Sequence, residues 1–193
     1  MNREKWLTEV ASQIEGHYFN ANDVSLDAYK VTCSWPSSRG LTSRRRTLGQ
    51  CFHAKASSAG IYEIFISPTL SDNVEVAAVL AHEMCHVADK CQNGHGAPFT
   101  KLARMCELEG KPTATVAGEA FKRWVETKTP TLGDYPHAEI EVNARSKKQS
   151  TRMIKCRCVE CDYIVRTSRK NLERAVPRCP DEECISFMLP MAV

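Results

Sequence analysis

The segment that follows Asn73 constrains the fold more than any other part of the chain. Its first half is almost continuously apolar, which indicates a largely buried helix for which Asn73 can serve as the N-cap. Its second half carries His82, Glu83 and His86 in the order His-Glu-x-x-His. Positions four apart lie on one face of a helix, one turn above each other. The two imidazoles therefore face the same way.

Two histidines and a glutamate in a buried helix need partners, because unpaired polar groups in a core are costly. A metal ion supplies that partner. Two imidazoles at this spacing bind one Zn²⁺, and the neighbouring carboxylate reaches a water on the metal and takes its proton. The alternative is a surface helix with two ordinary histidines. The apolar first turns favour a zinc metallopeptidase with ligands His82 and His86 and with Glu83 as the catalytic base.

A catalytic zinc usually has three protein ligands and one open position. His95 is the candidate for the third ligand. It follows His86 by nine residues, after a loop broken by Asn93, Gly94 and Gly96 that can turn the chain back over the metal.

In these motifs the chain resembles the SprT-like metallopeptidase family, which includes the Spartan proteases that digest DNA–protein crosslinks. The resemblance covers about residues 30–105 and the C-terminal tail. It implies that His82, His86 and His95 are zinc ligands and that Glu83 is the general base. Compact members of this kind are often encoded by phages and bacteria. The matching residues are His82 to His86, His95-Gly96, Phe99, Trp35, Gly49-Gln50-Cys51 and Ile66-Ser67-Pro68.

We expect an α+β fold, which the resemblance specifies as a compact zincin-like metallopeptidase domain with an N-terminal helix, a small β-sheet and the metal helix. Residues 1–144 should form this domain, and residues 145–193 a basic linker and a zinc ribbon. Hydrophobic periodicity and breaker residues predict the elements. They are helices at 3–19, 98–109 and 116–127, strands at 31–35, 50–54 and 61–66, and a turn-rich segment at 130–136.

The ten cysteines bear on the compartment. No apolar run approaches the length of a membrane span, and the N-terminus lacks the apolar core of a signal peptide. We therefore expect no membrane partner and a cytoplasmic location, or the host cytoplasm or nucleoid if a phage encodes the chain. Clustered cysteines in a reducing compartment more often hold metal than form disulfides.

Five cysteines fall in the last 38 residues. Cys158 and Cys161 form a tight pair, and Cys179 and Cys184 form a second pair after 17 intervening residues. Two such pairs are typical of a structural Zn²⁺ site with four Cys ligands, which would also stabilise a module too small to fold on its own core. Cys156 is an alternative to Cys158 as the first ligand. The chain is thus expected to bind two zinc ions, one catalytic and one structural.

Charge is distributed unevenly along the chain. The net charge is +3, but residues 144–193 hold 11 Lys and Arg against 6 Asp and Glu, which leaves the remainder slightly acidic. A basic tail indicates an acidic partner such as DNA, although a solubilising surface has the same composition. The candidate phosphate contacts are Lys147, Lys148, Arg152, Arg166, Arg169 and Lys170.

These features together predict a zinc-dependent endopeptidase that acts on DNA-associated proteins, with the ribbon aiding nucleic-acid binding. The alternative is a nucleic-acid-binding zinc protein whose three-His metal site is not catalytic. Glu83 favours the enzyme, since a structural site does not need that carboxylate. Tyr62, Tyr135 and His137 are candidate oxyanion donors, but packing is the simpler role for each.

Overall fold

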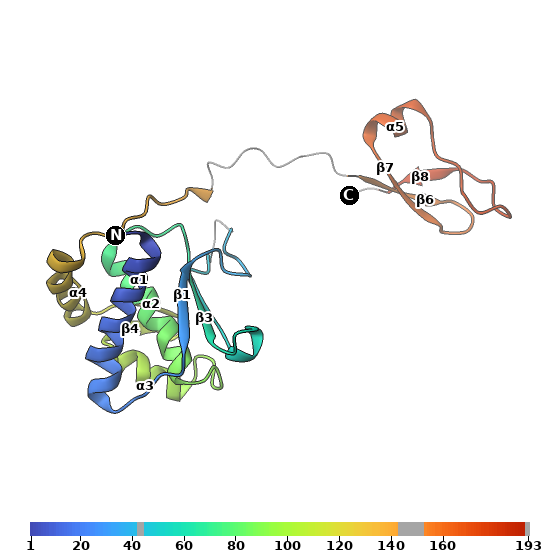
Figure 1. Ribbon diagram of the computed structural model, residues 1–193. Helices are drawn as coiled ribbons and strands as arrows, with labels where there is room; N and C mark the ends of the chain where they lie inside the picture. The colour runs from blue at the N-terminus through green and yellow to red at the C-terminus, as the bar shows by residue number, and fades with distance from the viewer. Residues whose placement is uncertain (42–44, 143–152, 192–193) are drawn as a thin grey trace. The chain divides into compact units, whose positions relative to one another are not determined.

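The computed structural model describes residues 1–41, 45–142 and 153–191 and has an α+β fold (Figure 1). It divides into two compact units, Met1–Arg145 and Ser146–Val193. Among the described residues, no helix is both long enough and apolar enough to cross a membrane.

A three-stranded sheet forms one layer of the first unit. Its strands are β1 (Tyr29–Cys33), β2 (Gly49–Phe52) and β3 (Tyr62–Ile66). Central β3 runs parallel to β1 and antiparallel to β2, so that β2 is an edge strand. Alternate side chains of β3 are buried, as the two-residue period of a strand requires. A 3-10 turn, Ala54–Ala56, ends the second predicted strand slightly early.

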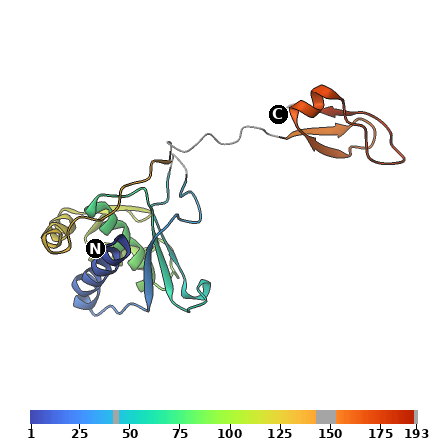
Figure 2. The same cartoon turned by 45° about the horizontal axis from the view of Figure 1, so that its top comes forward.

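Two helices cover one face of this sheet, as Figures 1 and 2 show. The first, α1 (Arg3–Ile14), is capped by Asn2 and buries Trp6, Leu7, Val10 and Ile14 at helical spacing. It continues as a π-helix, Glu15–Phe19, and a 3-10 turn, Asn20–Asn22. The second helix, α2 (Asn73–Ala88), carries the His-Glu-x-x-His motif and packs against β2 and β3.

The expected N-cap of α2 is wrong by one residue. Asp72 is the cap, and its carboxylate accepts a hydrogen bond from the Glu75 backbone N–H at 2.8 Å. The side chain of Asn73 instead donates to Asp134 at 2.8 Å and accepts from the Tyr135 backbone N–H at 2.7 Å. Asp and Asn are about equally good N-caps, so these long-range bonds decide between them.

The helix predicted over 98–109 is also wrong at its C-terminal end. Helix α3 (Ala97–Met105) is shorter, and a hairpin follows it, formed by β4 (Leu108–Lys111) and β5 (Ala114–Ala117). Glu107 adopts a left-handed conformation with φ of 55°, which reverses the chain, and buried Leu108 anchors the hairpin.

The helix predicted over 116–127 begins later and extends further than expected. It is α4 (Glu119–Leu132), and it contains Pro130, which we expected in a turn. Proline lacks the backbone N–H needed in a helix interior, but in the last turn this removes only one bond close to the end.

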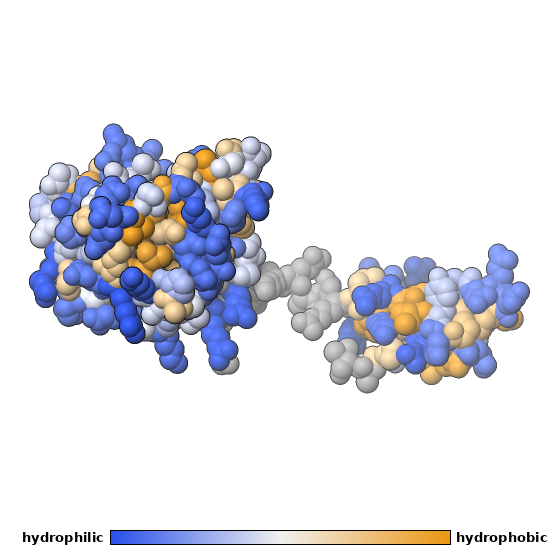
Figure 3. All heavy atoms as spheres, turned by 90° about the horizontal axis from the view of Figure 1, so that it is seen from below, coloured by the Kyte–Doolittle hydropathy of each residue, from blue (hydrophilic) through white to orange (hydrophobic). Residues whose placement is uncertain are grey.

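The second unit is a small sheet with a short helix. Strand β6 (Ile154–Cys158) lies between β7 (Ile164–Thr167) and β8 (Met188–Pro190), and α5 (Arg169–Arg174) follows β7. Its buried residues are three cysteines and Met188. Several hydrophobic side chains are exposed on its surface, which Figure 3 shows in orange among hydrophilic neighbours. They include Val159, Ile185, Phe187 and Leu189.

The central strand supplies a stability prediction. Ile64 of β3 is fully buried, so Ile64→Ala should lower the free energy of unfolding by about 2–5 kcal/mol through lost apolar contact and a residual cavity. The matched control is Ile140→Ala at a side chain that is 45% exposed, where the loss should stay within about 0.5 kcal/mol. Urea unfolding of both variants checks this, and equal losses would contradict the assigned core.

Candidate metal centre and catalytic cleft

Three imidazoles converge at the C-terminal half of α2. His82 and His86 come from the helix, and His95 comes from the loop between α2 and α3. One ligand atom from each lies within 4.8 Å of the other two, and the Nε2 atoms of His82 and His95 are 3.2 Å apart. Tetrahedral zinc with Zn–N bonds near 2.0–2.1 Å separates its nitrogens by about 3.3–3.4 Å. The donor set and its spacing therefore fit Zn²⁺.

Phe99 of α3 supports the three rings from one side. It is fully buried, and its ring centroid lies 4.8 Å from that of His82, 4.4 Å from that of His86 and 4.9 Å from that of His95. A rigid aromatic surface against all three imidazoles restricts their rotation. The three candidate ligands are thereby held in position by the protein itself.

The hairpin provides a hydrogen-bond partner for the first histidine. The Nδ1 atom of His82 lies 2.8 Å from the hydroxyl of Thr115 on β5. When Nδ1 donates this bond, Nε2 keeps the lone pair that a metal requires. Thr115 thus holds the orientation of His82, and when its hydroxyl accepts this bond it also fixes the tautomer that leaves Nε2 free for a metal.

The loop that carries His95 is fastened by Asp89, the residue that ends α2. Its buried carboxylate accepts from the backbone N–H of Asn93 at 2.8 Å and from its side-chain amide at 2.7 Å. Lys90 and Cys91 both have φ of 52°, a left-handed conformation that turns the chain sharply. These contacts bring His95 back over the helix.

Burial keeps the three imidazoles uncharged at neutral pH. Burial, with the nearby His86 and His95, lowers the pKa of His82 to about 3. Burial also lowers the pKa of His86, to about 4, against the opposing charge of Asp89, and it lowers the pKa of His95. Neutral imidazole is the form that coordinates a metal, so no proton has to be displaced.

Glu83 is buried next to the ligands and is only 5% exposed. Burial raises its pKa to about 8, and a hydrogen bond from the Cys51 backbone acts in the opposite direction. Gly49 of β2 packs directly against it, because a Cβ at this position would lie 2.5 Å from Glu83 Oε1 and 2.7 Å from Val79 Cγ1. A carboxyl group with a pKa near neutrality is suited to accept and return a proton.

A cleft of about 1010 Å³ opens over these groups. Residues 47–51 form one wall, and residues 111 and 113–116 of the hairpin form another. His82, Glu83, His86 and His95 also line the cleft. Among the described lining residues, Glu83 is the only acid, whereas four are cationic: Arg39, Arg45, Arg46 and Lys111. The surroundings of the cleft are therefore basic.

A model of the SprT-like family matches residues 7–118. The chain belongs to the SprT-like family. The family inferred from the motifs is thus confirmed, and the match extends on both sides of the 30–105 segment. The C-terminal tail, which is also part of the resemblance, lies outside the match. Comparisons with curated proteins and with solved structures gave no match.

The second unit of this SprT-like protein holds a second candidate metal site. The sulfur atoms of Cys158, Cys161, Cys179 and Cys184 lie within 4.8 Å of one another. Two contacts are short, 3.5 Å for Cys158–Cys184 and 3.4 Å for Cys161–Cys179. A tetrahedral zinc with Zn–S bonds near 2.3 Å places its sulfurs about 3.8 Å apart, so the cluster fits this ion. Cys156, the alternative ligand, is buried in the core of the unit and is not in the cluster.

The other predicted site residues that the structure describes are not members of the two clusters. Arg166, Arg169 and Lys170 lie on β7 and α5 of the second unit. Lys147, Lys148 and Arg152 lie outside the described residues. The oxyanion candidates Tyr62, Tyr135 and His137 are not among the described residues that line the cleft. Tyr62 packs on His53, Tyr135 on Trp6, and His137 contacts the Pro68 carbonyl.

Sequence reasoning missed Thr115 and Asp89 as positioning residues. Thr115 lies in the hairpin where local patterns predicted only a helix boundary, and no local signal links it to His82. Asp89 did offer a signal, since it is an acidic residue at the end of the metal helix, before the loop to His95.

Thr115→Val tests the support of His82. The substitution keeps the side-chain shape but removes the hydroxyl, so zinc affinity should fall about 10–100-fold, as for other partners that orient metal-bound histidines. Competition with a zinc chelator measures it. Thr113→Val is the matched control, because Thr113 lines the same cleft on the same hairpin. Equal affinities for wild type and Thr115→Val would contradict the role assigned to the hydroxyl.

Proposed function

We propose that this SprT-like protein is a zinc-dependent endopeptidase that cleaves DNA-associated proteins, including proteins crosslinked to DNA. Its catalytic unit would be a zincin-like domain. The observation that carries the proposal is the convergence of three neutral imidazoles and one buried carboxylate on a single cleft.

His82, His86 and His95 are the residues that would hold the catalytic zinc. When bound there, zinc supplies a Lewis acid that acidifies a water molecule and polarises the scissile carbonyl. Glu83 takes the proton of the attacking water and delivers it to the leaving amine. Its burial excludes bulk water, and the Cys51 backbone N–H orients it.

The cleft favours a polypeptide substrate over a small molecule. Its volume of about 1010 Å³ is at the upper end of the range for small-molecule sites. One wall is edge strand β2, which pairs only with β3 among the described strands. An edge strand offers unpaired backbone groups to an extended peptide.

Two sets of cations support a nucleic-acid partner. Arg39, Arg45, Arg46 and Lys111 line the cleft. In the second unit, Arg166 of β7 lies opposite Lys155 of β6 in the sheet register, and Arg169 and Lys170 begin α5. Cations of this kind bind phosphates. We propose that the second unit, stabilised by zinc at its four cysteines, helps to hold the protein on DNA.

Glu83→Gln tests the catalytic role. The substitution keeps size and polarity but removes the base, so kcat on a DNA-bound protein substrate should fall at least about 100-fold. Zinc content should stay at two ions per chain, measured by atomic emission. Glu75→Gln is the matched control, because Glu75 lies in the first turn of the same helix and not among the cleft residues. It should keep wild-type activity.

The same experiment separates the two functions predicted from the sequence. If Glu83→Gln digests the substrate as fast as wild type, the peptidase mechanism is wrong. If wild-type protein loaded with zinc binds DNA but cleaves neither substrate nor itself, the three-His site is not catalytic and the protein is a nucleic-acid-binding zinc protein.

The DNA contacts are tested by joint substitution of Arg166, Arg169 and Lys170 with Gln. DNA affinity should fall, and the slope of log K against log salt should decrease in magnitude by about 2–3. Each phosphate contact that is lost means that binding releases about one counterion fewer. Fluorescence anisotropy over a salt series measures both. Replacing Lys5, Lys55 and Lys101 of the first unit by Gln removes the same charge and should leave the slope unchanged. Equal slopes in all three proteins would show that these residues of the second unit do not contact DNA.

A further inference from the structure

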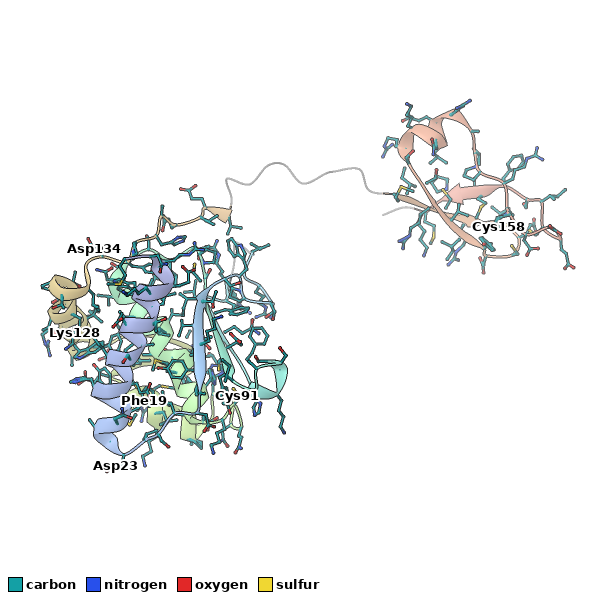
Figure 4. All side chains as sticks on the ribbon, viewed as in Figure 1. Phe19, Asp23, Cys91, Lys128, Asp134 and Cys158 are labelled. Atoms are coloured by element: carbon teal, nitrogen blue, oxygen red, sulfur yellow. The ribbon has the colours of Figure 1, made fainter. Side chains whose placement is uncertain are left out.

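Two thiols line the cleft without belonging to either candidate metal centre. Cys51 lies on β2, and Cys91, labelled in Figure 4, lies in the loop after α2. Their Sγ atoms are 3.8 Å apart, although the residues are 40 positions apart in the chain. Both are only partly buried and both line the cleft, so small solutes can reach them.

A second cysteine pair has the same spacing but a different environment. The Sγ atoms of Cys85 and Cys106 are 3.9 Å apart, but both residues are fully buried. Oxidation of thiols depends on exposure and on the fraction of thiolate. The molecule thus contains two thiol pairs with almost the same Sγ–Sγ distance, one accessible to oxidants and one protected by burial.

The geometry of the cleft pair permits a bond. A disulfide has an S–S length near 2.05 Å, so the sulfurs must approach by about 1.8 Å. Cys51 lies on an edge strand and Cys91 in a loop, and neither is fixed by close packing on all sides. The hydrogen bond with Cys51 lowers the pKa of Cys91, so Cys91 is the thiol of the pair that ionises more readily.

We propose that Cys51 and Cys91 are an oxidisable dithiol that a peroxide converts to a disulfide across the active-site cleft. The Cys91 thiol loses its proton, and the thiolate attacks one oxygen of hydrogen peroxide, breaking the O–O bond. This gives a sulfenic acid at Cys91 and a hydroxide, which takes up the proton that the thiol released and becomes one water. The Cys51 thiol then attacks the sulfenic sulfur, which forms the S–S bond and releases a second water. Hydrogen peroxide gains the two electrons that the thiols lose.

The bond would join two parts of the catalytic site. Cys51 donates its backbone N–H to Glu83, and the loop of Cys91 leads to His95. In a reducing compartment, disulfides are usually transient and sense the redox state. This modification site goes beyond the proposed peptidase activity, and its chemistry does not depend on that activity.

Peptide mapping tests the proposal on the full chain loaded with zinc. Reduced protein is treated with hydrogen peroxide, its free thiols are blocked with N-ethylmaleimide, and it is digested with trypsin without reductant. Peptides 47–55 and 91–101, which contain Cys51 and Cys91, should be recovered linked, with two hydrogens lost, and dithiothreitol should separate them. Recovery of both peptides without a link overturns the proposal.

The protected pair and two variants serve as controls. Peptides of Cys85 and Cys106 should stay unlinked at the peroxide dose that links the cleft pair, and linkage of both pairs at the same rate contradicts selective reactivity. Cys91→Ser should abolish the link to peptide 47–55, whereas Cys85→Ser should retain it. If Cys51 in Cys91→Ser links equally fast to another cysteine, Cys91 is not its specific partner and the proposal fails.

Discussion

The structure depends on how α2, a buried helix, accommodates the polar side chains that it carries. This helix fills the space behind the sheet with apolar side chains, yet it also carries two imidazoles and a carboxylate. Each needs a partner outside the helix, because a buried polar group without one is costly. Strand β2 provides the Cys51 N–H for Glu83, and strand β5 provides the Thr115 hydroxyl for His82. The sheet and the hairpin are thus held to the helix at the polar residues of the candidate site.

The position of His95 requires an unfavourable backbone conformation in the loop before it. Lys90 and Cys91 are both left-handed, which costs about 1–2 kcal/mol per residue for non-glycine residues. The two hydrogen bonds from Asn93 to the carboxylate of Asp89 offset this cost, as does the bond from the Cys91 N–H to the His86 carbonyl at 2.8 Å. The result is a turn that places His95 against His82 within a few residues of the helix end.

The parts of the two candidate metal sites that could be predicted from the sequence are those whose residues are close together in the chain. The His-Glu-x-x-His motif and the pair Cys158–Cys161 are grouped by a single turn of chain, so the sequence indicates their proximity. The contact of Thr115 with His82 and those of Asn73 with Asp134 and Tyr135 join distant segments, which periodicity does not encode. Cys156 and Cys158 are two apart on β6 and share a face, so alternation buries both. Only the position of the following turn selects Cys158 for the cluster.

Gly49 explains how the Glu83 carboxylate can be buried and still line the cleft. Any side chain at this position would occupy the space of the Glu83 carboxylate, as the 2.5 Å approach of a Cβ to Oε1 indicates. Because Gly49 has no side chain, β2 lies close enough to α2 to bury Glu83, and Cys51 of the same strand supplies the hydrogen bond. The position of β2 therefore sets the environment of the carboxylate. The proposed disulfide from Cys51 to the His95 loop would act on that same strand, so oxidation would also change the surroundings of Glu83.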